Sequence, residues 1–157
     1  MKLLSRNHDG CTFLLGKKER RILLELLQRF PVLNGNYQDQ RSKKLKIKPA
    51  GDRHLLVETL EEFRKQTRRD LEEILNDEHR WVADSRGMRL LLTPDQLKIL
   101  LQVLNDVKVG SWVRLGCPSD LESVPVPALN KEIIELTWAV NTVTVFQMVF
   151  LQALDND

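Results

Sequence analysis

The stretch Leu90–Gly116, LLLTPDQLKILLQVLNDVKVGSWVRLG, decides the fold. It begins with a short apolar run, passes through Thr93-Pro94-Asp95 and continues with apolar residues at helical spacing. Thr caps helices well, Pro suits the first helical turn, and Asp complements the helix dipole. The stretch therefore predicts a buried strand, then a helix that ends near Gly116. Because its polar stripe is so narrow, we expect this helix to be central to the domain. Its apolar positions are Leu97, Leu100, Leu101, Leu104, Val107, Trp112 and Leu115, widened by Ile99, Val103 and Val113.

A similar pattern occurs earlier in the chain. Shifting the sequence by 77 residues lays Phe13–Arg29 (FLLGKKERRILLELLQR) over Leu90–Asp106, with six of the seventeen pairs identical. Two unrelated amphipathic helices would also align in this way, because both segments are rich in leucine. Each copy, however, is followed by a long loop and a second long helical pattern. The sequence thus leaves two interpretations open: unrelated helices, or an internal duplication of β-α-α type with halves 11–83 and 88–154.

Length and composition favour a single soluble domain covering residues 1–157. The chain is 42% hydrophobic and 29% charged, and its net charge is only +2, which excludes a strongly basic or acidic class of protein. We expect an α+β fold, mainly helical, with four helices and a small antiparallel sheet. The expected strands are Leu3–Ser5, Thr12–Leu15 and Arg89–Leu92. The expected helices besides the central one are Lys17–Phe30, Arg53–Ala83 and Ala128–Ala153.

Two features bear on localisation. Cys11 and Cys117 lie far apart without metal-ligand spacing, and two reduced cysteines of a cytoplasmic protein fit this pattern better than a disulfide. The N-terminal stretch is too short and too polar after Leu4 to be a signal peptide. We therefore expect a cytoplasmic protein.

The last predicted helix has an uncharged run of nineteen residues, Leu136–Leu154. The run has the length of a membrane span. We expect no membrane span, because six Thr, Asn and Gln residues interrupt the run and no positive charges flank it. Such a helix belongs either in the core or between its own domain and a second subunit, so a homodimer is expected.

The central helix carries polar residues that suggest an interface. Asp106 shares a face with apolar residues, where burial without a cationic partner would be costly. Gly110 would allow another backbone to approach closely. We expect a polar contact across an interface, with Arg114 of a second copy as one partner. The alternative is that Asn105 and Asp106 lie at the edge of the solvent-exposed stripe of the helix. The candidate interface residues are Asn105, Asp106, Gly110, Arg114, Asn141 and Thr144.

A basic run, Arg41–Lys48, has five positive charges and no negative one. With three arginines of the following helix it forms a candidate anion-binding set, as a nucleic-acid-binding regulator would need. The run has no aromatic residue to stack on bases, so a solvated loop and a solvated helix face are the alternative. The set is Arg41, Lys43, Lys44, Lys46, Lys48, Arg64, Arg68 and Arg69.

The sequence shows no catalytic, cofactor or metal-binding motif. His8, His54 and His79 lack partners at metal-ligand spacing, and no cofactor is expected. An enzyme with a spatially assembled site would start from Asp106, His79 and Arg114. We favour a non-catalytic protein that self-associates and binds another protein.

Leu104-Asn105-Asp106-Val107-Lys108 followed by Arg114-Leu115-Gly116 resembles an uncharacterised bacterial domain family. Members are similar around a Leu-Asn-Asp-x-Arg stretch, and they share an early Glu-Arg helix (compare Glu19-Arg20) and an early Trp in the last helix (compare Trp138). Here Lys108 replaces the Arg, and Trp112 stands where the family has a small residue. The resemblance implies a cytoplasmic bacterial protein with a regulatory role near the proteolysis machinery, and it carries over no catalytic residue.

Overall fold

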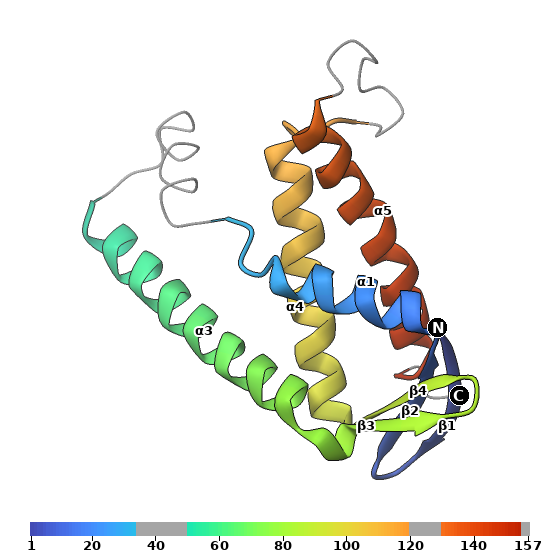
Figure 1. Ribbon diagram of the computed structural model, residues 1–157. Helices are drawn as coiled ribbons and strands as arrows, with labels where there is room; N and C mark the ends of the chain where they lie inside the picture. Colours follow the sequence, from blue (N-terminus) through green and yellow to red (C-terminus); the bar gives the residue numbers. More distant parts are fainter. Residues whose placement is uncertain (34–49, 120–129, 155–157) are drawn as a thin grey trace.

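The computed structural model describes residues 1–33, 50–119 and 130–154, which form an antiparallel sheet and four α-helices (Figure 1). The strands are β1 (Lys2–Asn7), β2 (Gly10–Leu15), β3 (Trp81–Asp84) and β4 (Gly87–Leu92). The helices are α1 (Lys17–Gln28), α3 (Ala50–Asn76), the short 3-10 helix η1 (Glu78–Arg80), α4 (Pro94–Arg114) and α5 (Lys131–Gln152). The expected class, an α+β fold that is mainly helical, is confirmed.

The sheet has the order β1-β2-β4-β3, and all neighbouring strands are antiparallel. Along β2, alternate side chains are buried, because successive side chains of a strand point to opposite faces. Phe13 is fully buried on this inner face and meets Phe150 of α5 edge to face, with ring centroids 5.0 Å apart. Aromatic pairs in this arrangement add to the stabilisation from burial. The end of α5 is thereby fixed on the sheet.

The two hairpins are equivalent under the 77-residue shift seen in the sequence. Phe13 pairs with Leu90, its own counterpart, and the β2–β4 ladder continues symmetrically on both sides. This pattern is that of a two-fold axis between the two central strands. Gly10 and Gly87, also counterparts, have φ of +153° and +154°, and a Cβ on either would lie 2.2 Å from a carbonyl oxygen of the facing strand. Only glycine permits so close an approach there. The chain thus contains two hairpin–helix–helix units.

Helix α4 is the centre of the fold, as its sequence predicts, and it contacts α1, α3, α5 and the sheet (Figure 1). The Thr93 hydroxyl accepts a hydrogen bond from the Gln96 N–H (3.3 Å), and the Gln96 side chain accepts one from the Thr93 N–H (2.9 Å). This reciprocal cap fixes the start of the helix at Pro94. Most apolar positions of α4 are buried or partly buried, but Val109 is 45% exposed, and Trp112, expected in the core, is 37% exposed.

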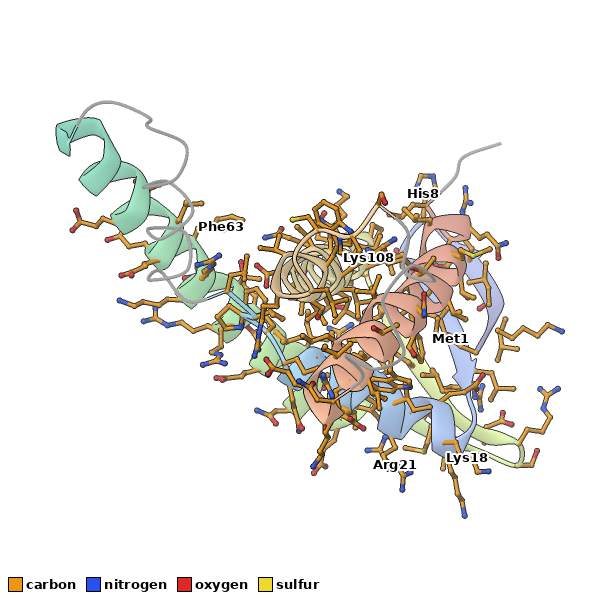
Figure 2. All side chains as sticks on the ribbon, turned by 90° about the horizontal axis from the view of Figure 1, so that it is seen from above. Met1, His8, Lys18, Arg21, Phe63 and Lys108 are labelled. Atoms are coloured by element: carbon orange, nitrogen blue, oxygen red, sulfur yellow. The ribbon has the colours of Figure 1, made fainter. Side chains whose placement is uncertain are left out.

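One expected helix end is wrong. The helix predicted to reach Ala83 ends at Asn76, because the Asp77 carboxylate accepts a hydrogen bond from the His79 N–H (3.0 Å) and closes a 3-10 turn. The following residues form β3, which the expected sheet lacked and which pairs with β4. The N-terminal half of α3 stands away from the other helices, where Phe63 is 55% exposed (Figure 2).

Candidate interaction surface

The outer face of α5 carries four large apolar side chains that the fold leaves exposed. Val145 is 63% exposed, Met148 60%, Ile134 54% and Leu151 49%. The opposite side of the helix is buried against α4, α1 and the sheet; its buried residues are Leu136, Ala139, Val140, Val143, Phe146 and Phe150. Contiguous apolar patches of this kind mark interaction sites. We call Ile134, Asn141, Val145, Met148 and Leu151 the outer face of α5.

The spacing of these residues is that of a helix–helix seam. Ile134, Asn141 and Met148 follow one another at intervals of seven, and Val145 and Leu151 lie between or beyond them at intervals of three or four. Apolar residues at such intervals form the stripe by which one helix packs along another. Asn141 is the polar residue in the middle of the stripe, and it is exposed.

The seam continues onto α1. A hollow of about 320 Å³ lies between the two helices, and its lining is mostly apolar. It is lined by Met1, Glu19, Ile22, Asn141, Thr142, Val145, Phe146 and Val149. Asn141 and Val145 therefore belong both to the outer face of α5 and to this hollow, so a molecule seated on the outer face would also reach α1.

Asp106, Gly110 and Arg114 contact their own chain in the structure. The Asp106 carboxylate accepts a hydrogen bond from the Val32 N–H (3.2 Å) and lies 4.0 Å from the Arg64 guanidinium. A Cβ on Gly110 would lie 2.6 Å from the Val32 Cβ, so the close neighbour of this glycine is the segment after α1. Arg114 pairs with Glu132 at the start of α5. The polar contact expected across an interface is thus made inside the chain by Asp106.

The other three interface candidates are placed differently. Asn105 is exposed on α4, and the Thr144 hydroxyl donates to the Val140 carbonyl of its own helix (2.9 Å). Asn141 alone lies in the apolar seam. The sequence prediction did not name Ile134, Val145, Met148 or Leu151, although the uncharged run and the seven-residue spacing were signals that could have identified them.

The predicted anion-binding arginines of α3 do not form one site. Arg64 faces Asp106, and the Arg68 guanidinium donates to the Phe30 carbonyl (2.8 Å). Both side chains therefore tie α3 to the segment after α1 and to α4. Arg69 is exposed. The basic run 41–48 lies outside the described residues.

The structure does not assemble the residues proposed for an enzyme. His79 is exposed in η1, next to the sheet, whereas Asp106 and Arg114 are bound to Arg64 and Glu132 further along the helices. Within the described residues no group of three or more His, Cys, Asp or Glu side chains is placed to hold a metal ion.

By length and composition α5 could cross a membrane, and one third of its most apolar window is buried in the fold. A core helix of a soluble protein has the same length and composition but is mostly buried.

No protein-family model matches the chain, and neither a curated protein nor a solved structure is significantly similar to it. The resemblance to an uncharacterised bacterial family stays a prediction.

Proposed function

We propose that this protein is a non-catalytic interaction module that self-associates through the outer face of α5. The observation that carries the proposal is the row of four large apolar side chains, each about half exposed or more, on a helix without charge from residue 136 to 154. Covering such a surface with another apolar surface is favourable because it removes apolar area from water. The bacterial, cytoplasmic and regulatory setting implied by the resemblance belongs to the same proposal.

A second copy of α5 fits this face in antiparallel orientation. With a two-fold axis at Asn141, Ile134 of one copy meets Met148 of the other, and the two Asn141 side chains meet each other. The side-chain amide can both donate and accept, so this pair satisfies itself. A single polar pair within an apolar seam fixes register and the number of subunits at some cost in stability. The same patch then serves both subunits, as a two-fold interface requires.

The size of the interface sets a further condition. Stable dimers bury about 800 Å² on each subunit, whereas a patch of the kind seen on α5 covers a few hundred Å². The dimer must therefore also cover the hollow beside α5, where Met1 and Ile22 extend the apolar surface.

The α3 arginines give less support to nucleic-acid binding, the alternative function, because Arg64 and Arg68 already have partners in the chain.

Light scattering after size exclusion tests the proposal on the full chain. The wild type is expected to be a dimer, and Val145→Lys and Met148→Lys are expected to be folded monomers, because each places charges in the seam. Phe63→Lys is the matched control, since it adds the same charge at an equally exposed apolar position on α3. A monomeric wild type, or equal dissociation by Phe63→Lys, would contradict the proposal.

Two further measurements separate the competing occupants. Flotation with neutral lipid vesicles that Val145→Lys abolishes would assign the outer face of α5 to a membrane instead. Excess absorbance at 260 nm in the eluted peak, lost at high salt, would favour nucleic acid.

A further inference from the structure

Two clefts lie where the turn of one hairpin meets the start of the helix that follows the other hairpin. The β1–β2 turn lies against the start of α4, and the cleft there has a volume of about 220 Å³. The β3–β4 turn lies against the start of α1, and the cleft there is larger, about 710 Å³. Under the 77-residue shift the two linings correspond in part: Asn7, Asp9, Gly10 and Cys11 stand at the positions of Asp84, Arg86, Gly87 and Met88.

The smaller cleft is lined by one cation, Arg80, and one carboxylate, Asp9, whereas the cleft beside α1 is more basic. The cleft beside α1 is lined by Lys17, Arg20, Ala83, Asp84, Ser85, Arg86, Gly87 and Met88. The residues that occupy the positions of Lys17, Arg20 and Arg86 in the other unit are Pro94, Leu97 and Asp9. None of the three positive charges is therefore repeated at the equivalent position of the other unit.

The one carboxylate that lines the basic cleft is already neutralised. Asp84 lies 3.7 Å from the Arg86 guanidinium and 3.3 Å from that of Arg89. A hydrogen bond from the Arg86 backbone N–H, followed by these charges, holds the pKa of Asp84 below its usual value. Among the described residues no carboxylate pairs with Lys17 or Arg20.

The Arg20 side chain packs against Trp81. Its guanidinium carbon lies 5.1 Å from the centroid of the Trp81 ring, a cation–π distance. Its Nε is buried and has no hydrogen-bond partner within the described part of the chain. Lys17 is one turn away on the same helix, and Arg86 stands on the facing turn. Two walls of the cleft thus carry positive charge.

We infer that the cleft formed by Lys17, Arg20 and Arg86 binds a small soluble ligand through a phosphate group. Clefts of 300–1,000 Å³ are of the size that holds small molecules. Arginine donors and lysine point charges are the usual partners of phosphate oxygens in proteins. The site is independent of the self-association proposed above, because it lies at the hairpin turn and not on the outer face of α5.

The probe for the test is inorganic pyrophosphate, titrated into the ¹⁵N-labelled full chain at constant ionic strength. We expect saturable amide shifts in residues 83–88 and 17–20. Lys17→Ala/Arg20→Gln is expected to weaken binding about tenfold or more, since it removes two charge-assisted contacts to the phosphate oxygens. The matched control is Lys18→Ala/Arg21→Gln, which removes the same charge from two exposed residues of α1 that do not line the cleft (both are labelled in Figure 2). This control is expected to bind as the wild type does.

Each other outcome counts against the inference. Shifts that do not saturate, or equal weakening by the control pair, would show general attraction to positive charge. If Arg20→Gln fails to fold because it leaves Trp81 uncovered, Lys17→Ala/Arg86→Ala replaces it with the same expected loss. Binding to vesicles that contain anionic phospholipid, without binding of pyrophosphate, would assign the charges to a lipid headgroup and overturn the soluble ligand.

Discussion

The substitution Gly110→Ala adds one methyl group where α4 meets the segment that follows α1. The added Cβ would lie 2.6 Å from the Val32 Cβ and 3.0 Å from its Cγ1. Relief of this overlap requires the segment to move, and overpacking of this kind costs about 1–3 kcal/mol. The movement also lengthens the hydrogen bond from the Val32 N–H to Asp106, which contributes about 1 kcal/mol. Alanine in place of glycine stabilises the helix by about 1 kcal/mol, which offsets part of this loss. The expected net loss of unfolding free energy is about 2 kcal/mol.

A double-mutant cycle isolates the contact. Val32→Gly removes the Cβ that Gly110→Ala would strike, at its own cost in packing and chain entropy. If the overlap is the cause, the two changes together cost about 2 kcal/mol less than the sum of the single changes, which is within the range of coupling between residues in contact. The assay is urea unfolding followed by circular dichroism and by tryptophan fluorescence, whose coincidence checks that the transition is two-state.

Two results would refute this reasoning. A Gly110→Ala protein that is as stable as the wild type or more stable would show that the segment after α1 does not press on α4. A loss that appears only at low protein concentration would show that Gly110 faces a second copy, as the sequence analysis expected, because the stability of an interface depends on concentration.

Four shorter predictions follow from other contacts. Asp106→Ala is expected to cost about 2 kcal/mol, because it removes a carboxylate that binds a backbone N–H and a partly buried arginine. Glu25→Ala, which removes an exposed ion pair, is expected to cost less than about 0.5 kcal/mol in the same urea assay. Asp84 has a lowered pKa in the folded protein, so its stabilising effect is present above the unfolded pKa of about 3.9 and is lost as the pH falls through the folded value. Asp84→Asn is therefore expected to flatten the acid limb of the stability–pH curve, and an unchanged limb would contradict this assignment. Burial raises the pKa of the Cys11 thiol, which donates to a backbone carbonyl (3.7 Å), so iodoacetamide is expected to modify the partly exposed Cys117 first. Peptide mass spectrometry after a short exposure to iodoacetamide shows which cysteine is modified first.

The start of α4 could be predicted from sequence because its signals are local. Thr93, Pro94 and Gln96 lie within four residues of one another, and their side chains make the cap by themselves. The strand β3 could not be predicted in the same way. Trp81–Asp84 is four residues long and follows a charged helical pattern, and it becomes a strand by pairing with β4. Its conformation is therefore decided by tertiary contact and not by its own sequence.

For the interface candidates, the contacts seen within the chain could not be predicted for a related reason. The sequence shows that Asp106 needs a partner, but the partners lie 74 and 42 positions away, at Val32 and Arg64. Spacing within one helix carries no information about such contacts. On α5 the difficulty was different, because apolar residues surround most of the helix. The seven-residue spacing indicates an apolar seam, and the packing of α4 and of the sheet shows which side of α5 is left uncovered.

A comparison of the two units supports the self-association proposed for the outer face of α5. Thr67 of α3 and Thr144 of α5 are counterparts, and each hydroxyl donates to the carbonyl four residues before it (2.9 Å). Under the 77-residue shift, Arg64 and Arg68 of α3 correspond to Asn141 and Val145 of α5. In α3 those positions hold the helix to its own chain through Asp106 and the Phe30 carbonyl. In α5 they form an exposed, uncharged seam with no such tie in the described structure. The face on α3 is tied to its own chain by these contacts, whereas the face on α5 is apolar and exposed. This difference is the reason for proposing a second copy of α5 as the occupant of that face.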